Sequence, residues 1–235
     1  MGRFFDLDSP LVQALGKMAD LMWLNRLVIF TSLPIFTFGA AITAAHYVAL
    51  KIKRGEEGYV TKDFFRSFKE KFKQSTIIWL LTILVIGVIL GDIYIMFYSG
   101  GTDIASWIQV LVMAAGILVI FTLMWVFALQ AKFSNAIKVT IKNAFAVSVW
   151  QFPKTVLMVV ASCVPVVVCL VSMAAFPIVF MFCFTFPVYV SVLLYDKTFK
   201  KLEEQIMERI KAENGETAEE EDEEEKIFSD APIED

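Results

Sequence analysis

Long apolar runs with few charges are the feature that most limits how this chain can fold. The clearest runs cover residues 76–98, 104–129 and 155–173, and another continues to Tyr195. An α-helix needs roughly 20 apolar residues to cross ~30 Å of hydrocarbon, and it satisfies its own backbone hydrogen bonds there. The whole chain is 57% hydrophobic, above the ~45–50% of a soluble domain. We therefore expect an all-α, polytopic transmembrane helical bundle.

The N-terminal 50 residues allow two arrangements. Ser9-Pro10 is typical of a helix start, because a hydroxyl cap precedes proline at the first helical position. Polar residues interrupt the apolar run that follows. Hydropathy alone favours one span over residues 27–50, preceded by an amphipathic surface helix, which makes five spans in all. The alternative is a helical hairpin that turns at Pro34–Gly39 and makes six.

A short internal repeat favours six helices. Residues 47–53 resemble residues 126–132, and Phe65 and Phe72 recur as Phe145 and Phe152. The repeated segments each follow a stretch that can form a helical hairpin, so residues 11–50 become a third hairpin. We therefore expect six helices as three hairpins, with five spans if the N-terminal segment crosses only once.

Basic residues indicate the orientation. Residues 51–74 contain eight Lys or Arg, residues 132–154 contain four, and the turns expected at 99–103 and 174–177 contain none. The positive-inside rule places the basic segments and the C-terminus in the cytoplasm. We therefore predict a multi-pass protein of a cytoplasmic membrane, with cytoplasmic amphipathic segments at 51–74 and 132–154.

The C-terminal residues are expected to leave the membrane. A helix over residues 197–212 should end at Asn214-Gly215. Residues 213–235 contain twelve Asp or Glu against one Lys, a composition too poor in apolar side chains to fold by itself. The predicted domains are a transmembrane domain over 1–196, a cytoplasmic helix over 197–212 and an acidic disordered tail over 213–235.

The segment TKDFFRSFKEKFKQ, residues 61–74, has the pattern of an amphipathic helix. Its phenylalanines recur at helical spacing, and basic side chains fill the remaining surface. We expect such a helix to lie at the cytoplasmic headgroups, where anionic lipids attract its charges. The alternative is a helix that binds a partner protein. The residues that define it are Phe65, Arg66, Phe68, Lys69, Phe72 and Lys73.

Four polar residues within apolar runs are candidates for function, because such groups are costly in lipid. They are Asp20, Asn25, Arg26 and Asp92. In the six-helix arrangement Arg26 and Asp92 lie at similar depth in the outer half, so an ion pair between them is favoured over a substrate or proton pathway. His46, the only histidine, is expected to be a packing residue.

Small residues cluster on one helix of the first hairpin. Their spacing repeats a small residue every fourth position, which lets helix backbones approach closely. The partner helix is expected within the bundle, with another subunit as the alternative. The face consists of Gly39, Ala40, Ala41, Thr43, Ala44 and Ala45.

Signatures of catalysis are missing from the sequence. We find no phosphate-binding glycine loop, no metal-ligand spacing and no nucleophile motif. The three cysteines lie in apolar runs without C-x-x-C spacing and are interpreted as small buried residues. We therefore expect no catalytic, cofactor-binding or metal-binding residue, no cofactor and no nucleic-acid partner.

Several stretches resemble the YesL family of bacterial membrane proteins, a family of unknown function. They are MGRFFDLDSP (1–10), LNRLVIFTSLPIFTFGAAITAAHYVALK (24–51), EEGYV (56–60) and FFRSFKEKFKQST (64–76). Members of this family resemble accessory proteins found beside carbohydrate-uptake ABC transporters. The resemblance implies a bacterial cytoplasmic membrane, with lipid and a carbohydrate ABC permease, or a second copy, as partners.

Three functions follow as expectations. The first is a non-enzymatic accessory component of a carbohydrate (glycan) ABC import system. Around residues 143–154 the chain lacks the acidic residue and glycine with which importer permeases engage their ATPases, so it is not expected to be the permease itself. The alternatives are a small secondary transporter or channel that uses Arg26 and Asp92, and a membrane regulator of carbohydrate uptake.

Overall fold

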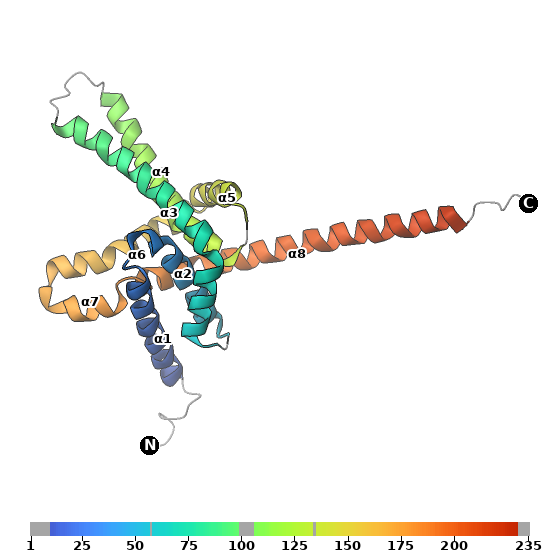
Figure 1. Ribbon diagram of the computed structural model, residues 1–235, viewed down its shortest axis with the longest axis horizontal. Helices are drawn as coiled ribbons and strands as arrows, with labels where there is room; N and C mark the ends of the chain where they lie inside the picture. Colours follow the sequence, from blue (N-terminus) through green and yellow to red (C-terminus); the bar gives the residue numbers. More distant parts are fainter. Residues whose placement is uncertain (1–9, 57, 99–105, 134, 230–235) are drawn as a thin grey trace, which may run out of the picture. The chain divides into compact units, whose positions relative to one another are not determined.

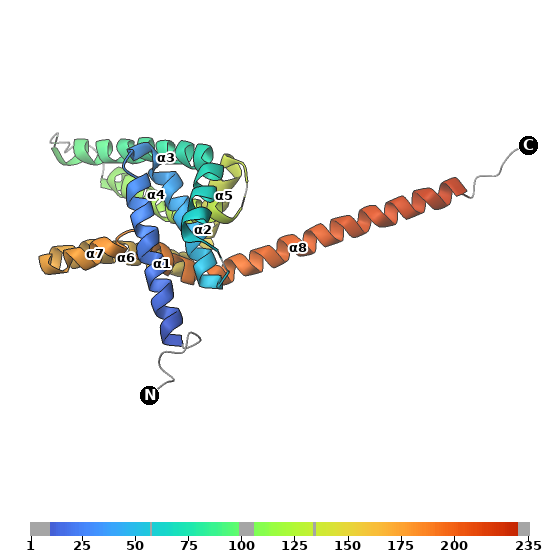
Figure 2. The same cartoon turned by 60° about the horizontal axis from the view of Figure 1, so that its bottom comes forward.

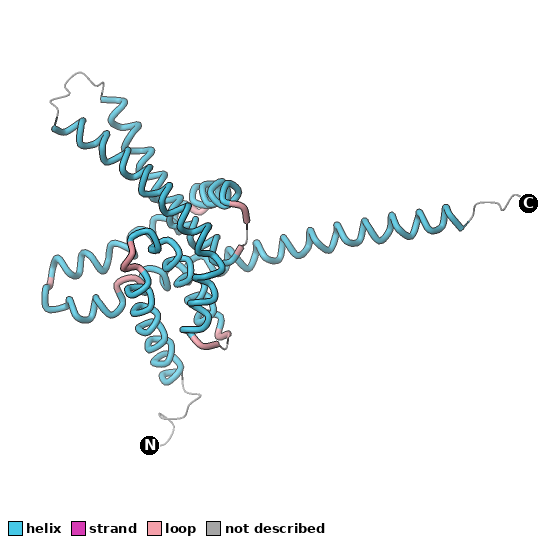
Figure 3. The backbone as a smooth tube through the Cα atoms, in the orientation of Figure 1, coloured by secondary structure: helices cyan, strands magenta, loops and turns pink. Residues whose placement is uncertain are grey.

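A computed structural model describes residues 10–56, 58–98, 106–133 and 135–229. Over these residues every regular element is a helix, so the predicted all-α class is confirmed (Figures 1 and 3). The elements are α1 (Pro10–Thr31), η1 (Ile35–Thr37), α2 (Phe38–Arg54), α3 (Val60–Tyr98), α4 (Ser106–Lys132), α5 (Ile137–Trp150), α6 (Phe152–Val171), η2 (Met173–Ala175), α7 (Phe176–Phe182) and α8 (Thr185–Ser229).

The chain divides into two compact units, residues 1–194 and 195–235. The second unit contains the C-terminal part of α8, which is a single helix through to Ser229. It therefore continues past Asn214-Gly215, where we expected an end and then a disordered tail. Glu and Ala are good helix formers, and one internal glycine costs only about 1 kcal/mol, so the local sequence permits this helix.

The first two helices form a hairpin, as the internal repeat predicts. Helix α1 ends at Thr31 and α2 begins at Phe38. The Thr37 hydroxyl closes the turn, because it donates to the carbonyl oxygens of Thr31 at 2.5 Å and Pro34 at 2.7 Å. Residues 34–39 therefore turn the chain, as predicted.

The number of candidate spans is smaller than the six expected. Residues 35–54, 60–94, 110–132 and 152–171 are long and apolar enough to cross a membrane, and a bent pair, 173–182 with 185–208, can make a fifth. Helix α1 is not among them, because Lys17, Asp20 and Arg26 interrupt its apolar residues.

One hydrogen bond joins α1 to the start of α3. The Trp23 indole N–H donates to Thr61 Oγ1 at 2.8 Å, beside the first residue of α3. Trp23 lies about 12 Å along the helix axis from the end of α1 at Thr31.

The second hairpin consists of α3 and α4. Helix α3 is continuous over 39 residues, so the amphipathic segment 61–74 runs directly into the span and is not a separate surface helix. Helix α5, in contrast, is a separate element within the segment 132–154 (Figure 2). The turn expected at 99–103 lies outside the described residues.

The third hairpin returns through a broken helix. Helix α6 ends at Val171, and a 3-10 turn over Met173–Ala175 reverses the chain at the predicted place. The return then breaks between α7 and α8 with a bend of 56°. Pro187 accounts for the break, because its ring nitrogen has no hydrogen to donate to the carbonyl of Cys183 four residues earlier.

Candidate functional site

The small-residue face of α2 is buried inside the chain. All six of its residues are buried, and α2 packs against α1, α3 and α4. A Cβ atom added at Gly39 would lie 2.6 Å from Trp79 Cβ and 2.7 Å from the Ser75 carbonyl oxygen. Thr43 lies four residues after Gly39 on α2, and its Oγ1 accepts a hydrogen bond from the Ser75 hydroxyl at 3.0 Å. The face therefore meets α3 within this chain, the first of the two partners considered.

Asn25 holds the broken helix in place. Its side-chain amide donates to the Phe180 carbonyl oxygen at 2.8 Å, and its carbonyl oxygen accepts from the backbone N–H groups of Phe184 at 3.0 Å and Thr185 at 3.3 Å. The side chain is 1% exposed. Backbone groups freed by a helix break are costly in an apolar interior, so Asn25 from α1 replaces the missing intrahelical partners.

A cavity of about 320 Å³ lies beside this break, and we call it the central cavity. Two proline-interrupted helices contribute to its wall, α6 at Pro165 and the start of α8 at Pro187. Helix α2 supplies His46, which is 5% exposed. Aromatic and aliphatic side chains make up most of the remaining wall, including Phe38, Trp79, Phe127 and Phe184.

The chemistry of the central cavity is largely apolar. The hydroxyls of Ser162 and Ser191 donate to carbonyl oxygens of their own helices, Met158 at 2.9 Å and Pro187 at 2.8 Å. A sugar needs many hydrogen-bond partners, and this wall supplies few. The cavity therefore does not have the lining of a carbohydrate pathway.

Arg26 and Asp92 do not form the expected ion pair. Both side chains are exposed, and neither makes an ion pair or side-chain hydrogen bond with another residue in the described ranges. Neither lines the central cavity. The reason is the packing of α3, whose early turns contact α2 while its later part, which contains Asp92, runs along α4. Gly116 on α4 lies close to Ile89 there.

A polar cluster that the sequence did not reveal joins α2 to α3. Lys51 Nζ lies 2.7 Å from Asp63 Oδ2, and both side chains are largely buried. Arg66 lies 3.4 Å from the other carboxylate oxygen, Asp63 Oδ1, and donates to the Tyr47 hydroxyl at 2.7 Å. Between the two helices Gly55 adopts a left-handed φ of 70° and caps α2. We call Tyr47, Lys51, Asp63 and Arg66 the α2–α3 polar cluster.

The amphipathic face of α3 is rotated from the one predicted. Phe64, not Phe65, is fully buried, whereas Phe65 is 37% exposed. Phe68 and Phe72 are half-buried and contact each other, with ring centroids 5.4 Å apart and ring planes tilted by 58°. Arg66, Lys69 and Lys73 are exposed, so the basic surface is present as expected.

Asp20 is exposed and lines a polar hollow of about 370 Å³ at the loop between α2 and α3. Lys17, Lys51 and Asp63 line the same hollow. Both basic and acidic side chains therefore line this hollow. Among the described residues no group of three His, Cys, Asp or Glu side chains is placed to hold a metal ion.

A comparison with known families adds one match. The family model described as a protein of unknown function, DUF624, matches residues 21–93. The matched region runs from α1 through α2 into α3 and includes three of the four stretches that carry the YesL resemblance. No curated protein and no solved structure matches the chain. The chain is thus similar, over its first three helices, to a family without an assigned function.

Proposed function

We propose that this chain is a non-enzymatic membrane protein that associates with another integral membrane protein, the permease of a carbohydrate ABC importer. The main observation in favour of a protein partner is the exposed side chain of Asp92 on α3. Its side chain has no ion-pair or hydrogen-bond partner among the described residues. It lies six residues before the end of α3, which places it about 9 Å from the helix end.

A carboxylate at that depth is costly in lipid. Long basic side chains reach the interface by extending along the helix, whereas an aspartate side chain is too short to do so. Intramembrane charges therefore pair with other polar groups. Since this chain offers Asp92 no such group in the described residues, a second membrane protein is the natural source.

Arg26 carries less of the argument than Asp92. It is exposed near the end of α1, five residues before Thr31, and its long side chain can reach the interface without a partner. The alternative of a small transporter that uses Arg26 and Asp92 has less support, because neither residue lines the central cavity.

The identity of the partner rests on the YesL resemblance. Members of that family resemble proteins found beside carbohydrate importers, so the permease and its ATPase are the first partners to test. A role without catalysis agrees with the lack of nucleophile and metal motifs in the sequence.

Co-purification tests this proposal. We would tag the full chain at native expression, extract it in mild detergent and identify the proteins recovered. We expect the permease and ATPase subunits, and at least about thirtyfold weaker association with Asp92→Asn, because removing one partner of a buried charge pair costs roughly 2–5 kcal/mol.

The matched control is Glu70→Gln, which also converts an exposed acid of α3 to its amide but lies in the basic segment. It should leave recovery unchanged. Isolation of the wild-type chain alone would overturn the proposal, as would equal recovery with Asp92→Asn. Recovery of a differently tagged second copy in place of the permease would replace the importer with a homo-oligomer.

A further inference from the structure

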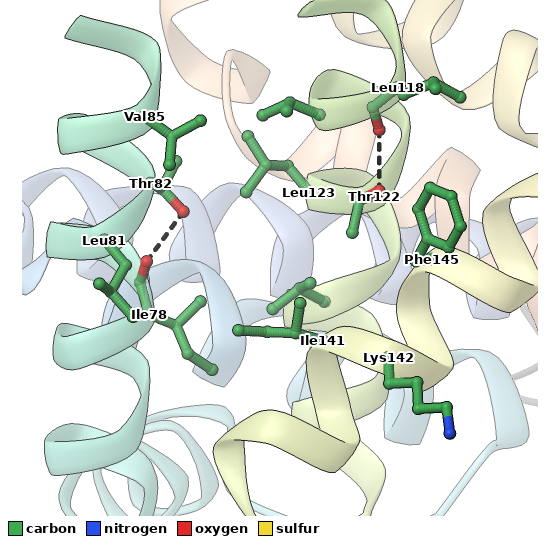
Figure 4. Close-up of a pocket in the computed structure, with 12 residues that line it drawn as sticks. Ile78, Leu81, Thr82, Val85, Leu118, Thr122, Leu123, Ile141, Lys142 and Phe145 are labelled. Carbon is green, nitrogen blue, oxygen red and sulfur yellow. Dashed lines mark hydrogen bonds between the residues drawn. The ribbon is translucent and has the colours of Figure 1, made fainter. Parts of the chain in front are cut away.

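An apolar groove lies between α3, α4 and α5, outside the central cavity (Figure 4). Its volume of about 410 Å³ falls within the ~300–1,000 Å³ of small-ligand pockets. Helix α3 contributes Leu81 and Val85, α4 contributes Leu118 and Leu123, and α5 contributes Phe145. We call this space the α3–α5 groove.

The interior of the α3–α5 groove offers no free hydrogen-bond donor. Its two hydroxyl groups donate to their own helices, Thr82 to the Ile78 carbonyl oxygen at 2.8 Å and Thr122 to the Leu118 carbonyl oxygen at 2.8 Å (Figure 4). A polar ligand would lose its hydration there without replacement. The interior therefore suits a hydrocarbon chain.

One end of the groove is cationic. Lys142 of α5 lines its edge, and its ammonium group points away from the apolar side chains (Figure 4). Helix α5 contains two lysines, Lys138 and Lys142, and no acidic residue. By the positive-inside rule this helix belongs at the cytoplasmic surface, where anionic lipid headgroups gather.

We propose that the α3–α5 groove binds one acyl chain of an anionic phospholipid, with the lipid phosphate at Lys142. The apolar interior takes the chain, and the single cation at its edge selects the charge of the headgroup. A partner helix is the alternative occupant, and the crosslinking experiment below distinguishes it from a lipid. The site does not depend on the partner proposed above.

Lipid retention measured by native mass spectrometry tests the site. The purified full chain would be mixed with phosphatidylglycerol or with phosphatidylcholine of identical acyl chains. We expect preferential retention of one phosphatidylglycerol. Lys142→Gln should lower that preference about fivefold, the factor that corresponds to ~1 kcal/mol for one basic residue near an anionic surface.

The control is Lys138→Gln, which removes an exposed lysine one turn earlier on the same helix and outside the groove. It should change retention much less than Lys142→Gln. Equal losses from the two variants would mean that α5 attracts anionic lipids only through its overall charge, and would overturn the site.

Filling the groove tests the acyl-chain half of the proposal. Thr122→Trp and, from the opposite wall, Val85→Phe should each reduce retention of both lipids while the protein still elutes as a single species. Two variants are used so that a folding defect in one does not decide the result. Unchanged retention in a folded variant would contradict the proposal. So would a photo-crosslinker at position 122 that captures a protein and no lipid.

Discussion

Helix α2 and the later part of α3 are both apolar, yet the first is mostly buried within the chain and the second is mostly exposed. In the apolar stretch of α2, 61% of the residues are buried inside the chain, against 11% in that of α3. The more hydrophobic helix is thus the more exposed one, with a mean hydropathy of 2.4 against 1.4. Small side chains let α2 approach its neighbours, whereas large apolar side chains on α3 remain exposed.

The polar groups of the two regions differ in the same way. Around α2 they are paired within the chain, as in the contacts between Thr43 and Ser75 and between Lys51 and Asp63. On the later part of α3, Asp92 is exposed and makes no such contact with the described residues. Helix α2 therefore organises the fold, and the later part of α3 is the surface on which the proposed association rests.

Gly39→Leu should break the α2 region most severely. The new Cβ atom would clash with Trp79 Cβ and with the Ser75 carbonyl oxygen. Neither atom can move easily, because one is part of the α3 backbone and the other is bonded directly to it. We expect a loss of about 3 kcal/mol or more in the free energy of unfolding, at or beyond the upper end for overpacking. Unfolding in mixed detergent, followed by tryptophan fluorescence, measures it.

Gly87→Leu is the matched control on α3, where nothing lies within 4 Å of the added Cβ atom. It should leave stability nearly unchanged or raise it slightly, because leucine is the better helix former. Equal destabilisation by the two substitutions would mean that α2 is no more tightly packed than α3.

Asn25→Leu should have the next largest effect. It leaves the Phe180 carbonyl and the Phe184 and Thr185 N–H groups without their side-chain partner. Unpaired buried groups cost about 1–3 kcal/mol, so the unfolding free energy should fall by that amount. Hydrogen exchange at Phe184 and Thr185 should accelerate selectively.

The control is Asn143→Leu on α5, whose side chain is exposed. It should change neither the unfolding free energy nor exchange at the break. If Asn25→Leu left exchange at residues 184–185 unchanged, Asn25 would not be what holds the broken helix.

Asp63→Asn should have a smaller effect, because Lys51 and Arg66 keep some access to solvent. We expect a loss of roughly 1–2 kcal/mol in the free energy of unfolding, since one charge of a partly buried pair loses its counter-charge. The double variant Lys51→Met/Asp63→Leu should recover part of that loss. Additive losses in the double variant would show that the two residues do not act as a pair.

Asp92→Asn should have the smallest effect on the isolated chain. Exposed side chains without contacts change stability by less than about 0.5 kcal/mol. The same substitution should nevertheless disrupt partner binding, so its two readouts separate association from folding. A large loss of stability in the purified chain would show that Asp92 serves the fold itself.

Long apolar runs were sufficient to predict the helical class, and the internal repeat was needed to predict the N-terminal hairpin. The small-residue spacing identified the buried face of α2, because only small side chains permit close helix contact. The turn at residues 34–39 followed from its proline and glycine and from the repeat. Each of these features depends on residues that are close together in the sequence, so the sequence was enough to predict it.

The break at Cys183–Phe184 and the polar cluster depended on distant contacts. Pro187 predicts a kink, but only packing against α1 shows that Asn25 completes it. Lys51 appeared as one of eight basic residues in its segment, and nothing local marked Asp63 as its partner. The Arg26–Asp92 pair failed because similar depth in the bilayer does not specify which helices are neighbours.

The most direct test of the contrast between α2 and α3 is photo-crosslinking in native membranes. A photoreactive phenylalanine analogue at Val88, which is 58% exposed one turn before Asp92, reports what covers this part of α3. We predict a crosslink to another membrane protein that Asp92→Asn abolishes, and none from Leu170, an exposed position on α6. Lipid adducts alone at both positions would contradict the claim that α3 is an association surface.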